Sequence, residues 1–182
     1  MKEIEVKAKV SDRESVEIEL TKIGVALGEP IIQKDIVFAE DLDSFHKFIP
    51  HSKFMRIRTE NGKNLLTFKK SEQSELSSLE FETEVSNAIE TINIIKQLGF
   101  QEAVRVSKIR RKARYKDFEI CFDEVEGLGS YIEVEKIQGD SADIVSTQEE
   151  LFGFLMELGL SRSDQELHGY DTLVRMKERQ WY

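Results

Sequence analysis

The N-terminal segment alternates charged and apolar side chains, one residue at a time. Residues 3–8 read EIEVKA, an E-x-E-x-K pattern. Successive side chains of a β-strand point to opposite faces, so Glu3, Glu5 and Lys7 share one face and the apolar side chains share the other. Glu is a poor strand former. A solvated outer face explains such a row when it occurs on one strand only.

The same alternation returns twice further along the chain. Residues 79–85 read LEFETEV and residues 132–135 read IEVE. Glu80 and Glu82 therefore share one strand face, as do Glu133 and Glu135. Three strands with this pattern in one small chain favour a common face that is lined with carboxylates.

The remaining strand-like segments complete a set that can close on itself. Residues 60–63 read ENGK, and Asn-Gly between two strands indicates a hairpin turn. A polar loop is expected over 71–78. About eight mostly antiparallel strands with few helices predict an α+β fold built on a closed eight-stranded β-barrel. The strands are expected near 2–10, 31–39, 54–60, 64–70, 79–85, 103–114, 117–124 and 130–137.

Three amphipathic helices are expected between the strands, each ended by a glycine. A fourth helix is predicted over 170–179, in a C-terminal helical segment that spans 161–182. The helix starts are expected at Ser11 with Glu14 as a capping box, at Ser86, and at Thr147 with Glu150, and the stops at Gly24, Gly99 and Gly159.

A barrel of eight strands has a lumen that holds packed side chains or one small ligand. If the apolar strand faces pack outward against the helices, the charged faces point inward and the barrel becomes a tunnel with a charged interior. Basic side chains alternate on other strands in the same way. They are Arg56 and Arg58, Lys69, and Lys108 and Arg110. The run from 108 to 114 taken alone also suits a solvated edge or a nucleic-acid patch.

Composition limits the class of protein further. The 182 residues suit one domain over 1–182, and the net charge of −9 argues against a general binder of nucleic acid or of acidic membranes. Cys121 is the single cysteine, so no intramolecular disulfide forms. The N-terminus lacks the apolar stretch of a signal peptide, and no stretch approaches the roughly 18 apolar residues of a membrane span. A cytoplasmic protein is therefore expected, and a homodimer is left open.

Carboxylates and bases that meet in one lumen indicate a specific kind of ligand. Carboxylates repel phosphate, whereas a hard divalent cation reverses that interaction. Mg²⁺ and Mn²⁺ bridge carboxylates to phosphates, while Arg and Lys bind the phosphates directly. The pattern thus predicts metal-dependent chemistry on a small-molecule triphosphate.

Six ordered motifs resemble the CYTH superfamily, also called triphosphate tunnel metalloenzymes. They are E-x-E-x-K at 3–7, R-x-R at 56–58, LT-x-K at 66–69, E-x-E at 80–82, K-x-R at 108–110, and Asp123 followed by E-x-E at 133–135. The sequences QKD at 33–35 and DEVEGLG at 123–129 look most like the class IV adenylyl cyclase branch. Residues 36–39 read IVFA where the family often has an aromatic residue and an acid.

The resemblance implies a role for each of these residues. Glu3, Glu5 and Glu133 are implied to bind divalent metals, with Glu135 or Asp123 completing or supporting the set. Glu80 and Glu82 are implied to orient bases within the tunnel. Lys108 and Asp123 are the implied catalytic residues. The implied triphosphate-binding residues are Lys7, Arg56, Arg58, Lys69, Lys108 and Arg110.

Three functions compete at this point. In a cyclase, metals and bases hold ATP while the ribose 3′-hydroxyl attacks the α-phosphorus and pyrophosphate leaves. In a triphosphatase, water attacks the terminal phosphorus of an inorganic, thiamine or nucleoside triphosphate. A non-catalytic binder of polyphosphate or nucleotide would show no turnover. Resemblance to the class IV branch favours the cyclase, and the named residues suit both enzymes.

Overall fold

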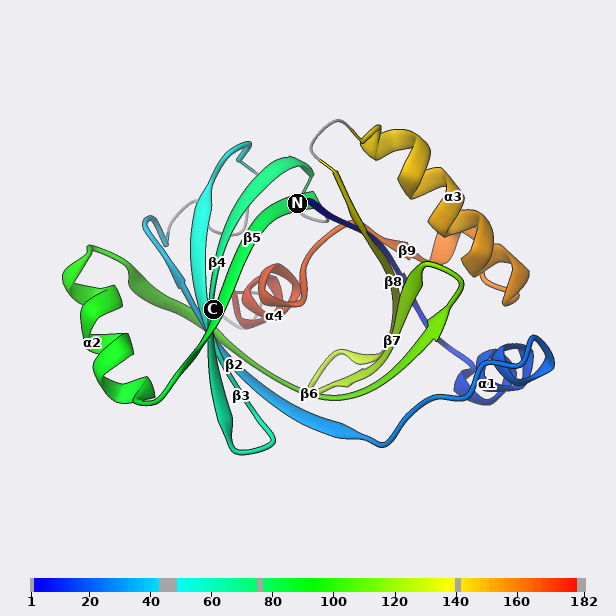
Figure 1. Cartoon of the computed structure of the whole chain (residues 1–182), viewed down its shortest axis with the longest axis horizontal. Coiled ribbons are helices and arrows are strands. Elements are labelled where there is room, and N and C mark those ends of the chain that lie inside the picture. Colours follow the sequence, from blue (N-terminus) through cyan, green and yellow to red (C-terminus); the bar gives the residue numbers. More distant parts are fainter. Residues whose placement is uncertain (1, 43–48, 75–76, 140–141, 180–182) are drawn as a thin grey trace.

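The computed structural model describes residues 2–42, 49–74, 77–139 and 142–179, and they form a closed antiparallel β-barrel with helices around it (Figure 1). Eight strands follow each other in the order β5-β4-β3-β2-β6-β7-β8-β1, and β1 pairs with β5 to close the ring. The predicted α+β barrel is thus confirmed. The strands are β1 Lys2–Lys9, β2 Ile31–Ala39, β3 Lys53–Glu60, β4 Lys63–Ser74, β5 Ser77–Val85, β6 Gln101–Tyr115, β7 Phe118–Val125 and β8 Gly129–Gln138.

The segments around the barrel complete the fold. A short ninth strand, β9, is paired with β1 and was not expected from the sequence. None of the described helices is long and apolar enough to cross a membrane. The helices are α1 Arg13–Lys22, α2 Ala88–Gln97, α3 Ile144–Glu157 and α4 Tyr170–Arg179, a 3-10 turn spans Arg162–Asp164, and β9 spans Gln165–Glu166.

The β3–β4 hairpin turns at Asn61-Gly62, as the sequence predicts. Both residues have positive φ, 49° and 76°, which the favoured two-residue hairpin turn requires. The expected polar loop over 71–78 is wrong, because β4 continues to Ser74 and β5 already begins at Ser77. Backbone pairing between Ser71 and Ser78 extends the ladder through these polar residues.

The barrel closes through a short contact. Among the described residues β1 pairs with β5 over Lys2 to Ile4, and farther along β1 the residues Lys7 and Ala8 pair with β9. On its other side β1 pairs with β8 along its whole length, with Glu5 opposite Glu135. The C-terminal segment therefore borders β1 at Lys7 and Ala8, beyond the described pairing with β5.

The predicted helix starts are wrong, whereas the predicted stops are right. α1 is capped by Asp12, whose carboxylate accepts the Ser15 N–H at 3.1 Å, instead of by Ser11. α2 is capped by Asn87 instead of Ser86, and α3 begins one turn before the expected Thr147 cap, with Asp143 as its N-cap. In each case a second good capping residue lies nearby, and the local sequence does not decide between the two. The three helices end before Gly24, Gly99 and Gly159, whose φ angles are positive.

The apolar core lies outside the barrel wall. One cluster joins the outer faces of β1, β7 and β8 to α1 and α3, and it includes Leu20, Phe122 and Leu151, all at most 2% exposed. A second cluster packs α2 against β2 and β3 through Ile95, Phe38 and neighbours. Each such side chain contributes about 1.5–3 kcal/mol on burial. Because the outward faces are used for packing, the charged faces are left for the interior.

α4 differs from the other helices because it lies within the ring of strands (Figure 1). Its Tyr170, Leu173 and Val174 pack with the inward-facing Val106 and with neighbours from β7 and β8. Its N-terminal end reaches the lining of the central cavity. One end of the tunnel is therefore bordered by the C-terminal helix.

Candidate active site

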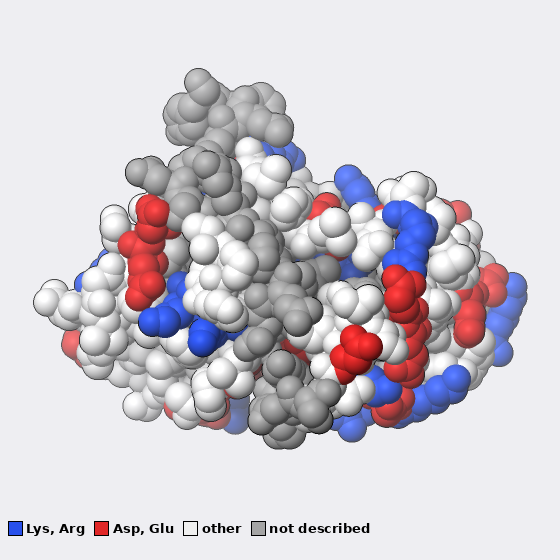
Figure 2. Space-filling view, turned by 90° about the horizontal axis from the view of Figure 1, so that it is seen from above, with Lys and Arg blue, Asp and Glu red and all other residues white. Residues whose placement is uncertain are grey.

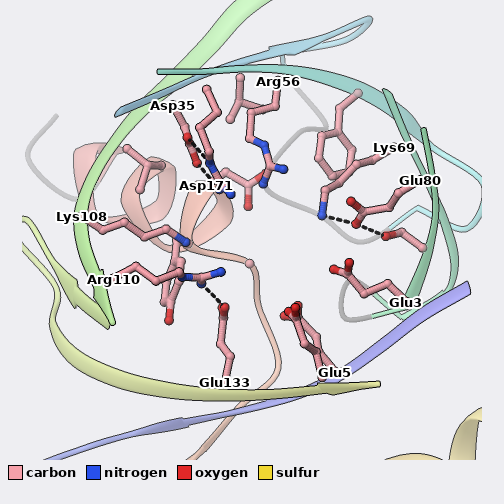
Figure 3. Close-up of a pocket in the computed structure, with 18 of the residues that line it drawn as sticks. Glu3, Glu5, Asp35, Arg56, Lys69, Glu80, Lys108, Arg110, Glu133 and Asp171 are labelled. Atoms are coloured by element: carbon pink, nitrogen blue, oxygen red, sulfur yellow. Dashed lines mark hydrogen bonds and ion pairs between the residues drawn. The ribbon is translucent and has the colours of Figure 1, made fainter. Parts of the chain in front are cut away.

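A cavity of about 310 Å³ lies inside the barrel, at the lower end of the range for small-molecule sites. Acidic and basic side chains line it in nearly equal number. In the close-up, Glu3 and Glu5 lie on one side and Arg56 and Lys108 extend from the opposite walls, while Asp35, Glu80 and Glu133 lie among the bases (Figure 3). Every site residue predicted by the sequence except Asp123, which lies behind Arg110, lines this cavity.

Three carboxylates form a cluster at the β1–β8 wall. Oxygens of Glu3, Glu5 and Glu135 lie within 4.8 Å of one another. Glu3 and Glu5 alternate along β1, and the β1–β8 register places Glu135 opposite Glu5. Burial, followed by repulsion from neighbouring carboxylates, raises the pKa of Glu5 to about 7, and burial also raises the pKa of Glu3 and Glu135. A divalent cation would remove this repulsion, so the donor set fits Mg²⁺ or Mn²⁺.

Glu133 lies beside this cluster but faces the bases. One of its oxygens is 3.2 Å from Lys7 Nζ, and the other accepts a hydrogen bond from Arg110. Burial alone would raise its pKa, but Arg110, Lys7 and Lys108 hold that pKa well below its usual range. Glu133 is therefore a permanent anion that neutralises two tunnel cations.

Asp123 on β7 lies directly opposite Arg110 on β6, where the register pairs them. The Arg110 guanidinium donates two hydrogen bonds to its carboxylate, at 2.7 and 2.5 Å. Lys108 Nζ is 3.5 Å from the same carboxylate. Burial, together with the nearby Arg110 charge, lowers the pKa of Lys108 to about 8. Lys108 thus shares its counter-ion, Asp123, with Arg110, which binds that carboxylate more closely. An anionic ligand would give the Lys108 ammonium a counter-charge that it does not share.

On the facing wall, Arg58 on β3 is held by Asp35 on β2. Two hydrogen bonds of 2.8 Å join the guanidinium to the Asp35 carboxylate, and both residues are buried. Burial would raise the pKa of Asp35, yet the hydrogen bonds from Arg58 and the charge of Arg56 hold that pKa far below its usual range. Arg58 is therefore fixed before any ligand binds.

Arg56, two residues earlier on the same face, is less well satisfied. Its guanidinium donates to the Thr67 hydroxyl at 3.1 Å and lies 3.5 Å from Glu82, which is largely exposed. Its buried Nε has no hydrogen-bond partner among the described residues. Lys69 on β4 forms an ion pair with Glu80 on β5, which lies opposite it in the register. The two E-x-E carboxylates of β5 therefore orient bases.

The geometry also locates the basic run of β6. Lys108 and Arg110 are buried in the cavity, at 6% and 5% exposure, so neither belongs to a solvated edge or to a surface patch for nucleic acid. Lys112, in register with both, reaches the cavity lining too. The alternation of this run was the signal that its side chains share one inward face.

Several lining residues were missed by reasoning from the sequence, among them Asp35, Tyr170 and Asp171. Asp35 could have been identified as a partner for a base from its place in the QKD motif, whereas Tyr170 and Asp171 reach the cavity from the start of α4. No local pattern marks these two residues, because their contacts are made with the opposite end of the chain. Cys121 is buried, and burial raises the pKa of its thiol, so it is a poor nucleophile.

The fold and the site define a class of protein: a closed β-tunnel whose interior is lined by a carboxylate cluster and a set of bases. Residues 1–170 match the model of the CYTH domain family. The chain belongs to this family, whose tunnel enzymes depend on divalent metals.

Similar proteins are found among both sequences and structures. "Putative adenylate cyclase MJ0240" of Methanocaldococcus jannaschii is 31% identical over 166 residues, which cover 90% of this chain and 93% of that protein. The PH1819 protein of Pyrococcus horikoshii has a TM-score of 0.78 at 27% identity, with 96% and 99% coverage. "Putative adenylyl cyclase HpAC1" of Hippeastrum, described as having a dominant triphosphatase activity, has a TM-score of 0.59 at 18% identity, with 92% and 90% coverage. At that identity the likeness to HpAC1 concerns the fold alone.

Proposed function

We propose that this protein is an enzyme that uses Mg²⁺ or Mn²⁺ to act on a small-molecule triphosphate inside its tunnel. We further propose the class IV adenylyl cyclase reaction, in which ATP becomes cyclic AMP and pyrophosphate. One observation carries the proposal: the cavity inside the barrel holds a cluster of like-charged carboxylates on one wall and bases on the others, of which Arg56 and Lys108 are incompletely paired. A triphosphate with a divalent cation neutralises both sets at once.

The carboxylate cluster is the proposed metal site. Glu3, Glu5 and Glu135 would hold the cation, which would neutralise them and attract phosphate oxygens. Glu133, the fourth carboxylate of the proposed metal set, stands next to the cluster and keeps Lys7 and Arg110 in place. The pKa values of these three carboxyl groups are raised, and a bound cation would lower them by favouring the ionised carboxylates.

The bases divide the proposed work on the triphosphate. Lys108 and Arg56 have the least complete partners, so they gain most from phosphate oxygens. Arg58 and Arg110 are already fixed by two-pronged pairs and would present their remaining N–H groups in a set direction. Lys7 and Lys69 complete the proposed set. Asp123 positions Lys108 and Arg110 in this scheme.

The cyclase assignment rests on relatives that carry this name: one, similar over 90% of this chain, is named a "Putative adenylate cyclase", and another, similar over 49% of it, is named an adenylate cyclase. A triphosphatase is the second candidate, favoured by the size of the cavity. A cavity of about 310 Å³ suits the triphosphate itself. In a cyclase, the nucleoside would extend beyond that cavity and bring its 3′-hydroxyl to the α-phosphorus.

Nucleic acid is a poorer ligand for this surface. The bases converge inside the cavity, and on the face seen in Figure 2 acidic side chains of the described residues are interspersed with basic ones. Binding of duplex nucleic acid normally needs a continuous basic surface.

The test uses the purified full-length chain with ATP and, separately, with inorganic tripolyphosphate. Each is incubated with Mg²⁺, with Mn²⁺ and with chelator, and the products are identified by mass. Glu5→Gln is the inactive control, and Glu84→Gln, an exposed glutamate paired with Lys63, is the matched active control. Cyclic AMP with pyrophosphate supports the cyclase. Orthophosphate without cyclic product contradicts the cyclase and supports the triphosphatase. Tight binding without turnover contradicts both and leaves a non-catalytic binder.

A further inference from the structure

Tyr170 stands where two tunnel lysines from different strands come together. It is the first residue of α4, it is 7% exposed, and it lines the cavity. Lys7 Nζ lies 4.2 Å from the centroid of its ring, and Lys108 Nζ lies 4.8 Å from the same centroid. Both distances are well within the range of a cation–π interaction. One ring therefore contacts an ammonium group from β1 and another from β6.

The ring is itself held firmly. Tyr131 on β8 meets it edge-on, with centroids 5.3 Å apart and an interplanar angle of 69°. Leu173 and Val174, one turn further along α4, pack in the same cluster. Two residues before the ring, the His168 carbonyl accepts a hydrogen bond of 3.0 Å from Lys7 Nζ. The start of α4 thus fixes Lys7 by two independent contacts.

A ring differs from a carboxylate as a partner for a lysine. A carboxylate cancels the ammonium charge, as Glu80 does for Lys69. The ring attracts the ammonium through its quadrupole and adds no counter-charge. Lys108 needs such a partner, because it shares its one close carboxylate, Asp123, with Arg110. The ring can hold Lys108 in place while its charge stays available to an anion.

We propose that Tyr170 is a positioning residue of the tunnel, whose ring holds the ammonium groups of Lys7 and Lys108 at the spacing that a bound triphosphate requires. This inference rests on the proposed function. It places the C-terminal segment, from the His168 carbonyl to Tyr170, within the substrate site. It also assigns the positioning role to the ring and not to the hydroxyl: the hydroxyl faces the Asp123 carboxylate but forms no hydrogen bond of normal geometry with the described residues, whereas the ring contacts both lysines.

The experiment compares Tyr170→Phe, which keeps the ring, with Tyr170→Leu, which keeps apolar volume without a ring. Binding of inorganic tripolyphosphate is measured by calorimetry, and KM and kcat are measured with the substrate that the wild type turns over. We expect Tyr170→Leu to weaken binding about tenfold, because two buried cation–π contacts are lost. We expect Tyr170→Phe to bind within about twofold of the wild type. Equal loss in both variants would overturn the role of the ring.

Leu173→Ala is the matched control for damage to α4. Leu173 packs in the same cluster as Tyr170 and contacts neither lysine in the cation–π pairs. This variant is expected to melt at a lower temperature and to keep the affinity for tripolyphosphate. If it loses as much affinity as Tyr170→Leu, docking of the helix explains the effect and the proposal is wrong.

A spectroscopic measurement tests the contact without a destabilising variant. In protein labelled with ¹³C-lysine, ring currents should shift the ε-methylene signals of Lys7 and Lys108 upfield, and Tyr170→Phe should preserve both shifts. Unshifted signals in the folded wild type contradict the proposal. Failure of the wild type to bind tripolyphosphate would instead contradict the proposed function, and the lysine spectrum separates these two results.

Discussion

Replacing Glu5 by Gln should make the metal-free protein more stable while it removes the metal response. Glu5 ionises near pH 7 in the folded protein against an ordinary value of 4.5, because it is buried and faces Glu133 and Glu3. Between these two pH values the unfolded chain has lost the proton that the folded chain still binds. Stability of the wild type therefore falls as pH rises from about 4.5 to about 7 and stays low above that.

The size of the effect follows from the shift. A shift of about 2.5 pKa units corresponds to about 3 kcal/mol at 1.36 kcal/mol per unit. This balance already includes the attraction of Lys7, whose Nζ lies 3.7 Å from the Glu5 carboxylate. Because glutamine does not ionise, the free energy of unfolding of Glu5→Gln should exceed that of the wild type by about 3 kcal/mol at pH 8 in chelator. The two proteins should converge below about pH 4.5, and most of the difference should already be lost at pH 5.

Urea unfolding at pH 5 and pH 8, with chelator and with Mn²⁺, measures this difference. A cation that binds only the folded state stabilises it by mass action, so Mn²⁺ should stabilise the wild type and have little effect on the variant. Glu84→Gln is the control, since Glu84 is exposed and should change stability by at most about 0.5 kcal/mol. The reasoning fails if Glu5→Gln and the wild type lose stability equally between pH 5 and pH 8.

Two further predictions concern the bases. Lys108→Ala should weaken triphosphate affinity or turnover by at least about tenfold. The affinity of the wild type should fall above about pH 8, because the Lys108 ammonium loses its proton there. Lys108→Arg should keep its affinity to higher pH. An unchanged affinity of Lys108→Ala in calorimetry would remove Lys108 from the site. Asp35→Asn should cost about 3 kcal/mol in urea unfolding, because it leaves the buried Arg58 guanidinium without its anion, and an unaltered unfolding midpoint would contradict this.

The alternation of charged and apolar residues was sufficient to predict the barrel and the orientation of its strands. Side-chain direction in a strand is a local property with a period of two, so the charged rows of β1, β5, β6 and β8 could be assigned to one interior. Gly24 and Gly99 were also read correctly, because a helix stop in the left-handed region depends on a single residue. The helix starts depend on competition between adjacent residues, such as Ser11 and Asp12, and local sequence does not resolve it.

Which acid meets which base depends on register, and local sequence contains no information about register. β1 and β8 are far apart in the chain, and their alignment places Glu135 opposite Glu5 and Glu133 opposite Lys7. A shift of two residues would keep every side chain on the same face and exchange these partners. Tyr170 is an extreme case, because its contacts exist only after the C-terminal segment enters the barrel.

The paired and the under-paired bases of the tunnel should serve different purposes. Arg58 and Arg110 each hold a buried carboxylate by two short hydrogen bonds, so removal of either base takes the main partner from a buried anion and should appear mainly as lost stability. Lys108 and Arg56 have shared or incomplete partners, so a ligand phosphate adds interactions there without displacing any. Triphosphate affinity should therefore depend mainly on the bases whose hydrogen bonds and ion pairs are incomplete in the folded protein. The buried carboxylates of the tunnel determine which bases those are.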